Sequence, residues 1–145
     1  MSDAAAAIIY LPNGAYVMQH RDNRPDIWYP DHWGCFGGAL DRGETPEQAL
    51  LRELQEELSF EPRDFRHFSS HTTTIEPIGL TTIRHYFEIP IDEEAFQTMV
   101  VSEGQGCGLL SHDDICGPAT PYRLASYDAF ALLLHINLLP QARQR

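Results

Sequence analysis

The sequence has little cysteine, no long apolar run and few basic residues. Three widely spaced cysteines form no CxxC pair, which argues against a disulfide framework and predicts reduced thiols in a cytoplasmic protein: Cys35, Cys107 and Cys116. No apolar run approaches the ~20 residues that a membrane-spanning helix needs, so we expect no membrane partner. The opening MSDAAAAIIYL has an acidic residue and no basic segment, so we expect a strand there rather than a signal peptide.

Positive charge is scarce, with 10 Lys and Arg against 21 Asp and Glu and a formal net charge of −11. This balance argues against nucleic acid as a partner, because binding a phosphate backbone requires a basic face. A small phosphorylated ligand that arrives with Mg²⁺ is not excluded, since the cation brings its own positive charge. The length of 145 residues suits one domain, residues 1–145, with one core.

Residues 38–60, GALDRGETPEQALLRELQEELSF, predict a helix with one acidic face. At about 100° per residue, Glu53, Glu56 and Glu57 fall within roughly a third of the helix circumference. Three like charges so close repel one another and raise each other's proton affinity. A hard divalent cation resolves this conflict, because Mg²⁺ prefers carboxylate oxygens as ligands.

The same helix carries an apolar face that is expected to pack on the core, made of Leu50, Leu51, Leu54 and Leu58. Thr45 is the predicted N-cap and Pro46 the first helical residue. The carboxylates are therefore predicted to stand on a rigid element that is anchored from its opposite side.

The spacing of this stretch resembles the Nudix box, G-x5-E-x7-R-E-U-x-E-E-x-G-U, in which U is a bulky aliphatic residue. The positions that match in register are Gly38, Glu44, Arg52, Glu53, Leu54, Glu56 and Glu57. Phe60 stands at the last U position, and Ser59 replaces the family's glycine. That glycine is expected to end the helix in a left-handed conformation, which costs any other residue about 1–2 kcal/mol. The alternative interpretation is a surface helix rich in solvated glutamates.

The resemblance to the Nudix hydrolase family (MutT-like) implies an α/β fold, the Nudix α/β/α sandwich with a mixed β-sheet between helices. It implies a Mg²⁺-dependent pyrophosphohydrolase, with Mn²⁺ as a substitute, that cleaves the diphosphate of a nucleoside diphosphate linked to another moiety, such as a nucleotide sugar or a (d)NTP. The alternative is a Nudix-type domain that binds such a ligand as a sensor without useful turnover. The complete set of glutamates favours the enzyme. Dimers are common in the family, so a homodimer is also compatible with the resemblance.

The resemblance also implies roles for single residues. Glu56 and Glu57 are expected to be the firmest metal ligands and Glu53 a ligand or the general base. Glu103, in a later glycine-containing loop, is expected to bind a further metal or to be the competing base. Arg52 is expected to orient a box glutamate through a charged hydrogen bond, with Glu44 as its partner or as a plain loop residue.

The pair Gly37-Gly38 lets the backbone approach a ligand closely. In the family that this sequence resembles, a carbonyl of this pair often coordinates the metal. The loop from His20 to His32 supplies Arg21 and Arg24 as candidate phosphate contacts, because arginine presents a planar fork to oxyanions. The alternative interpretation is that each arginine is only a solvated charge on the loop.

Two tryptophans of the same region, Trp28 and Trp33, are candidates for stacking on a base or sugar. They are equally suited to closing the end of the core. Elsewhere we expect strands at residues 4–11, 15–19, 33–40, 65–75, 80–89 and 107–111, with turns at 12–14 and 77–79. A second long helix is predicted at residues 124–139, with a core-facing stripe of Tyr127, Phe130, Ala131, Leu134 and Leu138.

Overall fold

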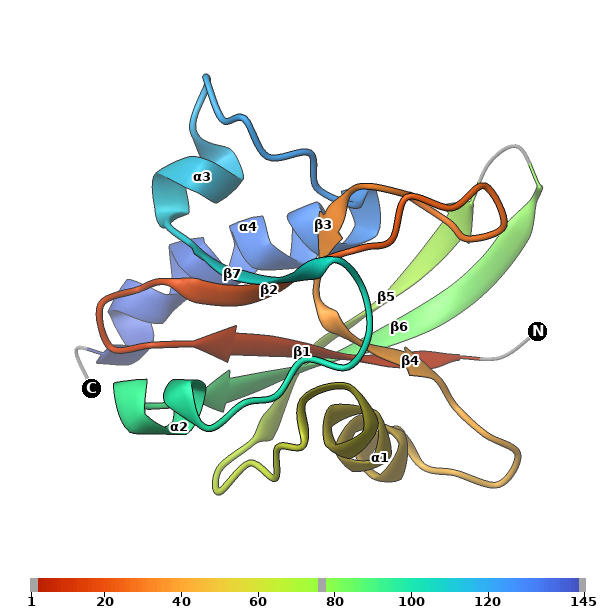
Figure 1. The fold of residues 1–145 in the computed structure, drawn as a ribbon, viewed down its shortest axis with the longest axis horizontal. Helices are drawn as coiled ribbons and strands as arrows, with labels where there is room; N and C mark the ends of the chain where they lie inside the picture. Colours follow the sequence, from red (N-terminus) through yellow and green to blue (C-terminus); the bar gives the residue numbers. More distant parts are fainter. Residues whose placement is uncertain (1–2, 76–77, 144–145) are drawn as a thin grey trace.

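The computed structural model of the chain describes residues 3–75 and 78–143 (Figure 1). The strands are β1 (Ala4–Tyr10), β2 (Tyr16–His20), β3 (Trp33–Gly34), β4 (Phe36–Ala39), β5 (Arg66–Ile75), β6 (Leu80–Pro90) and β7 (Gly106–Leu110). The helices are α1 (Pro46–Leu58), α2 (Glu93–Gln97), α3 (His112–Cys116) and α4 (Ser126–Arg143). Of the predicted turn at 77–79, Pro77 lies outside the described residues.

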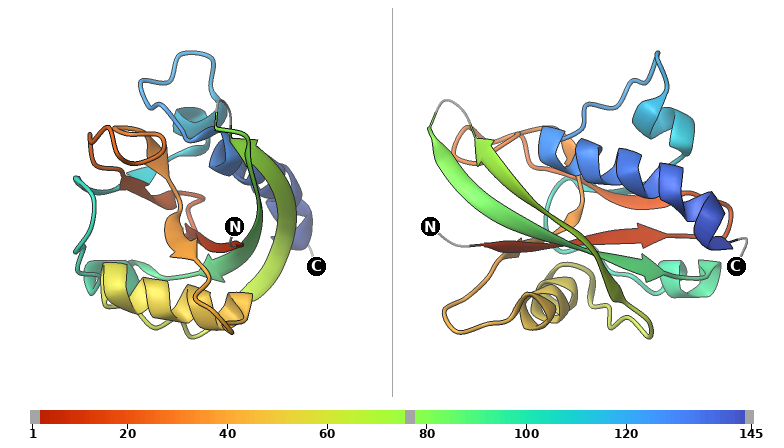
Figure 2. Two further views of the ribbon diagram at one scale, coloured as in Figure 1. Left: turned by 90° about the vertical axis from the view of Figure 1, so that its right-hand side faces the viewer. Right: turned by 180° about the vertical axis from the view of Figure 1, so that it is seen from behind.

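The strands form one mixed sheet in the order β3-β2-β1-β6-β5, in which β4 also pairs with β1 and β7 with β2. β1 is parallel to β6 and antiparallel to β2 and β4. Helix α1 covers one face and α4 the other, as the two views of Figure 2 show. Within the described residues, no helix has both the length and the apolar character that crossing a membrane requires.

The single strand predicted at residues 33–40 is wrong, because two short strands with different partners occupy this stretch. Gly34 of β3 pairs with Gln19 of β2, whereas Gly37 of β4 pairs with Ala6 of β1. Cys35 lies between them. The first part of β1 (residues 4–7) pairs with β4, and its last part (residues 9–10) pairs with β2. The segment 33–39 therefore pairs first with β2, as β3, and then with β1, as β4.

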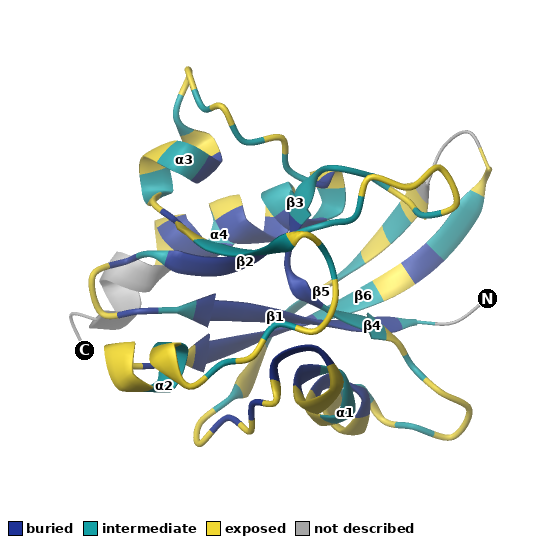
Figure 3. Ribbon diagram, in the orientation of Figure 1, coloured by how far each residue is buried: buried dark blue, intermediate teal, exposed yellow. Residues whose placement is uncertain are grey.

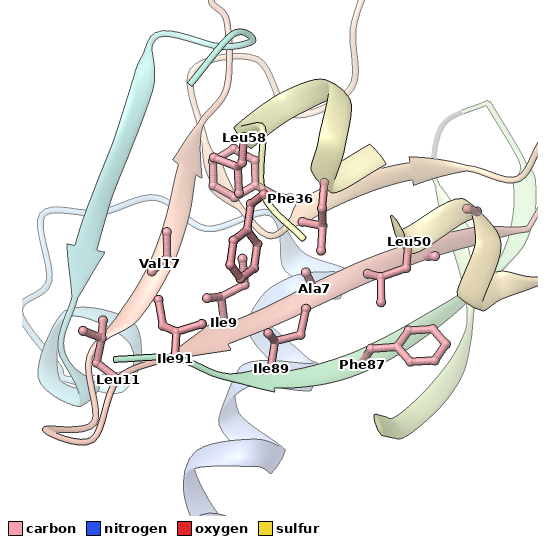
Figure 4. Close-up of a cluster of buried hydrophobic side chains, with 14 residues drawn as sticks. Ala7, Ile9, Leu11, Val17, Phe36, Leu50, Leu58, Phe87, Ile89 and Ile91 are labelled. Carbon is pink, nitrogen blue, oxygen red and sulfur yellow. The ribbon is translucent and has the colours of Figure 1, made fainter. Parts of the chain in front are cut away.

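The core consists of two clusters, one on each face of the sheet. Between α1 and the sheet lie Phe36, Leu50, Leu58, Phe87 and Ile89, among others (Figure 4). Between the sheet and α4 lie Ile8, Tyr16, Met18, Tyr86 and Leu132, among others. Neighbouring residues of a strand point to opposite faces, so Tyr86 and Phe87 belong to different clusters. The four alanines at the start of β1 are all buried, which leaves little side-chain bulk between the sheet and its covering helices.

Helix α1 begins as predicted. The Thr45 hydroxyl accepts a hydrogen bond from the backbone N–H of Gln48, and the Gln48 side chain accepts from the N–H of Thr45, so the two residues form a capping box. The inclusion of Leu51 in the buried face is wrong, because its side chain is 36% exposed. It lies about 100° around the helix from the fully buried Leu50 and therefore points away from the sheet.

The predicted core stripe of α4 is also partly wrong. Phe130 is 57% and Leu138 44% exposed, whereas Ala131 is buried. Figure 3 shows that α4 carries both buried and exposed stretches. The helix buries a different set on the sheet: Asp128, Ala131, Leu132, His135 and Ile136. The helix is apolar almost all round, so periodicity alone could not select its inner face.

Candidate active site

The acidic face of α1 lies against the glycine pair of β4. The backbone N–H of Gly37 donates to Glu57 Oε1 at 3.0 Å. A Cβ atom on Gly38 would lie only 2.4 Å from Glu53 Oε1, and one on Gly37 would lie 2.1 Å from the carbonyl oxygen of Ala5. Gly37 also has a positive φ of 145°. Glycine is therefore required at position 37 for β4 to fit against β1, and a side chain at position 38 would displace the Glu53 carboxylate.

Two of these carboxylates share a confined space. Glu57 is 2% exposed, and the Glu53 side chain is 15% exposed. Burial, together with the charges of Glu53 and Glu103, raises the pKa of Glu57 to about 8. Burial also raises the pKa of Glu53, and the charges of Glu56 and Glu103 add to that effect. The crowding expected from the sequence is thus present, and it is strongest at Glu57.

Glu56 lies toward solvent, with its side chain 54% exposed. Arg52 donates to it at 3.4 Å and to Glu53 at 2.9 Å through the same Nη1 atom. The Nε and Nη2 atoms of Arg52 donate hydrogen bonds of 2.8 and 2.9 Å to the two carboxylate oxygens of Glu44. Nη2 also donates to the carbonyl oxygen of Ala39. Hydrogen bonding to Arg52 lowers the pKa of Glu44 to about 2. Glu44 is therefore the partner of Arg52 in this structure.

The loop that carries Glu103 is fixed to α1 at one end and to β2 at the other. Ser102 donates through its backbone N–H to the carbonyl of Glu57, at 3.0 Å, and Gln105 donates in the same way to the carbonyl of His20, at 2.8 Å. Gly104 has a φ of 81°, and a Cβ there would lie 2.7 Å from the His20 carbonyl oxygen. The loop holds Glu103 close enough to influence the pKa values of two box glutamates.

A pocket of about 400 Å³ opens beside this loop. It is lined by Gln19, Arg21, Asp22, Arg24, Ile27, Ser102, Glu103 and Gly104. Arg21 donates from Nε to the carbonyl of Trp28, and Arg24 is exposed and paired with Asp26. The structure thus brings both predicted arginines and Glu103 to one cavity.

The two tryptophans do not line this pocket. The ring of Trp33 stacks on His20, with ring centroids 4.7 Å apart, and meets Tyr122 edge-on. Trp28 is 42% exposed, and its carbonyl oxygen accepts the bond from Arg21. Trp33 therefore packs within the protein, and Trp28 stands at the surface of the loop.

Sequence reasoning did not predict the hydrogen-bond partners of two buried polar side chains, Gln19 and Asp128. Gln19 is 6% exposed on β2 and donates from Nε2 to Glu57 Oε2 at 3.3 Å. Asp128, the buried acid of α4, accepts from the backbone N–H of Cys35, from Arg84 and from the hydroxyl of Tyr86. In the sequence, each of these residues is visible only as a polar residue next to apolar ones. That pattern indicates a buried polar group but does not identify its hydrogen-bond partner.

The acidic groups fit a hard divalent cation by their chemistry. Across residues 3–75 and 78–143, no three His, Cys, Asp or Glu side chains converge closely enough to hold a metal ion, and Arg52 holds Glu53 and Glu56. The donors are nonetheless carboxylate oxygens crowded into a cradle that a Cβ at Gly38 would fill. Their mutual repulsion is relieved by a cation with hard oxygen preference.

Comparison with known proteins agrees with this geometry. The family model described as the NUDIX domain matches residues 2–132. An RNA pyrophosphohydrolase of Aeromonas hydrophila is 42% identical over 59 residues, which cover 38% of this chain and 33% of that protein. An 8-oxo-dGTP diphosphatase of Escherichia coli strain K12 is 56% identical over 32 residues, 22% of this chain and 25% of that protein. The matched parts thus span a third or less of these two relatives.

The fold has a counterpart among solved structures. The crystal structure of a MutT NUDIX hydrolase from Burkholderia pseudomallei aligns with a TM-score of 0.74 and 20% sequence identity. The alignment covers 91% of this chain and 95% of that one. At this identity the likeness concerns the fold alone, and it confirms the predicted α/β architecture with a mixed sheet between helices.

Proposed function

Because the chain belongs to the NUDIX domain family, we propose that it is a divalent-cation-dependent pyrophosphohydrolase that cleaves phosphoanhydride bonds. The observation that carries the proposal is the group of Glu53, Glu57 and Glu103, whose charges act on one another beside the glycine pair. Glu103 of this group lines a pocket that two arginines also line. Acidic and basic groups so placed suit a cation on one side of a diphosphate and arginine forks on the other.

The carboxylates divide the labour. Bound Mg²⁺, or Mn²⁺ in its place, supplies neutralisation of the diphosphate charge and a lowered pKa for an attacking water. Glu57, held by two hydrogen bonds, would be the firmest ligand of this cation, and Glu56, which Arg52 contacts at 3.4 Å, would hold it as well. Glu53 serves as a ligand or as the general base, with Glu103 as the competing base and further ligand.

The backbone and Arg52 complete the cradle. A carbonyl of the pair Gly37-Gly38 is proposed as a neutral ligand, because the pair lies against Glu53 and Glu57. Arg52 fixes the acidic face of α1 relative to the loop at residues 39–44, since it bonds Glu44 and Glu53 at once. It acts by orienting the glutamates.

The proposed substrate is a small nucleoside diphosphate derivative. Arg21 and Arg24 would bind its phosphates in the pocket. Trp28, which stands at the surface of the loop, would lie near the base or sugar, whereas Trp33 is already packed against His20 and Tyr122. The two curated relatives carry names that specify RNA and 8-oxo-dGTP as their substrates. A net charge of −11 favours a single nucleotide, such as a (d)NTP or a nucleotide sugar, over an RNA chain for this protein.

The test is release of phosphate, pyrophosphate or nucleoside monophosphate with and without Mg²⁺. The screen should cover nucleotide sugars, dinucleoside polyphosphates and canonical and oxidised dNTPs. Glu57→Gln should lower kcat at least about 100-fold while the chain still folds. Glu47→Gln, an exposed first-turn change on the same helix, is the matched control.

Three outcomes are informative. Mg²⁺-dependent turnover that Glu57→Gln abolishes supports the proposal. Unchanged turnover in that variant removes the metal assignment. Tight nucleotide binding without turnover in the wild-type chain would identify a sensor domain instead.

A further inference from the structure

Gln19 is a polar residue near the end of the buried strand β2. It is 6% exposed, and its neighbours Val17 and Met18 are 0% and 1% exposed. Strand β2 is paired on both sides at this point, with Gly34 of β3 and Cys107 of β7 opposite Gln19. A buried amide is costly unless it is hydrogen-bonded, so its partner is the reason to examine it.

That partner is the most buried carboxylate of the site. The Nε2 atom of Gln19 donates to Glu57 Oε2 at 3.3 Å, and the N–H of Gly37 donates to Oε1 at 3.0 Å. Glu57 is therefore oriented from two sides by neutral donors. A neutral donor fixes a carboxylate without adding a positive charge that would compete with a cation, in contrast to Arg52 on Glu53.

The same side chain also supports the loop that carries Glu103. A Cβ on Gly104 would lie 3.2 Å from Gln19 Cγ and 3.3 Å from Nε2, so the loop passes directly over the amide. Ser102 and Gln105 fix this loop to α1 and β2 on either side of Gly104. Gln19 thus touches both Glu57 and the loop segment next to Glu103.

From these contacts we infer that Gln19 is a positioning residue, which sets the orientation of the Glu57 carboxylate and its spacing to the Glu103 loop for a bound divalent cation. The inference rests on the proposed function, because it concerns the same cation site. Gln19 acts through Glu57 and the loop and takes no part in bond making.

Gln19→Met tests the inference, because methionine has a similar length and no donor. Titration with Mn²⁺, followed by the electron paramagnetic resonance signal of the free ion, should show a Kd about tenfold weaker than in the wild type. With the best substrate of the screen, kcat should fall by a similar factor at fixed Mg²⁺, while KM for the nucleotide changes little. Met18→Ala is the control, since it removes buried bulk from the same strand on the opposite face.

A second measurement needs neither metal nor substrate. The side-chain amide resonances of Gln19, assigned by their loss in Gln19→Met, should move in Glu57→Gln and stay in place in Glu47→Gln. The inference is overturned if they do not move, or if Gln19→Met binds Mn²⁺ no more weakly than Met18→Ala does. A wild-type chain that binds Mn²⁺ but hydrolyses nothing would refute the proposed function and leave the Mn²⁺ and resonance comparisons to decide the role of Gln19.

Discussion

Glu57 carries an acidic group into a place that water barely reaches. Its carboxyl group is only 2% exposed and has two acidic neighbours. It therefore keeps its proton up to a pH well above the ordinary pKa of a glutamate. Two neutral groups, the side-chain amide of Gln19 and the backbone N–H of Gly37, donate directly to it. The residue is therefore costly to ionise unless a cation is present.

This cost should appear as a pH dependence of stability. In the folded chain the pKa of Glu57 is about 8, whereas the pKa of a glutamate in an unfolded chain is about 4.3. Between these two pKa values the folded state binds more protons than the unfolded state, so the free energy of unfolding falls as pH rises from about 5 to 8. The slope is at most about 1.4 kcal/mol per pH unit, and the total loss is a few kcal/mol.

Thermal unfolding in chelator measures this effect. The melting temperature should fall with pH in the wild type and much less in Glu57→Gln, and added Mg²⁺ should reduce the fall. An equal decline in both proteins would show that Glu57 is not its source.

Ser59 offers a second test at the scale of one residue. It ends α1 with φ 50° and ψ 42°, the left-handed conformation expected of the glycine that it replaces. Ser59→Gly should raise the free energy of unfolding by about 1 kcal/mol, because glycine adopts this conformation without a Cβ clash. Urea unfolding followed by circular dichroism measures it. Ser59→Ala keeps the Cβ and should give no such gain, and a gain of equal size there would contradict the explanation.

At the scale of the element, α1 works as a support with two different faces. Leu50, Leu54 and Leu58 are fully buried against the sheet, and Thr45 caps the start of the helix. Arg52 then connects the helix to the preceding loop through Glu44 and the carbonyl of Ala39. The helix, its cap and its loop form one hydrogen-bonded unit around the carboxylates.

Arg52→Lys should disturb that unit while keeping its charge. Lysine has no planar fork, so it cannot bond Glu44, Ala39 and Glu53 at once. We expect kcat to fall about tenfold, with a melting temperature within a few degrees of the wild type. Arg42→Lys, at an exposed position in the same loop, is the control. Equal activity of the two variants would show that the fork of Arg52 does not orient the site.

At the scale of the molecule, a buried ion pair between Asp128 and Arg84 helps to fasten α4 to the sheet. Asp128 is 2% exposed and bonds Arg84 of β6, at 3.0 Å, as well as Tyr86 and the backbone of Cys35. The Arg84 guanidinium also lies 4.2 Å from the ring centroid of Tyr127. These contacts join a helix, β6 and the junction between β3 and β4.

Asp128→Ala should therefore cost about 3–5 kcal/mol, because it leaves the charge of Arg84 buried without its partner. The double variant Asp128→Ala with Arg84→Met should recover part of that loss, since it removes the orphaned charge. Urea unfolding of both variants decides the matter. Asp113→Ala, an exposed acid in α3, should cost well under 1 kcal/mol. A double variant no more stable than the single one would exclude the buried charge as the cause.

Local chemistry explains which elements could be predicted from the sequence. The N-cap at Thr45 and the acidic face of α1 depend on neighbours within one turn, so their pattern is visible in the chain. Leu51 and Phe130 were assigned to the core wrongly, because an apolar residue on a helix is buried only where another element covers it. The division of residues 33–40 into two strands depends on where β1 offers free edges.

The sequence by itself determined the box helix, its cap, the crowding of glutamates and the glycine pair, because each follows from spacing within about twenty residues. Only the tertiary structure decided that Gln19 and Gly37 donate to Glu57. It also decided that Arg52 donates to both Glu53 and Glu56, and that Glu103 lies close enough to affect the pKa of Glu57. The physical reason is that burial and hydrogen-bond partners come from segments far apart in the chain. A carboxylate's pKa depends on those neighbours, and the order of residues along one helix does not contain them.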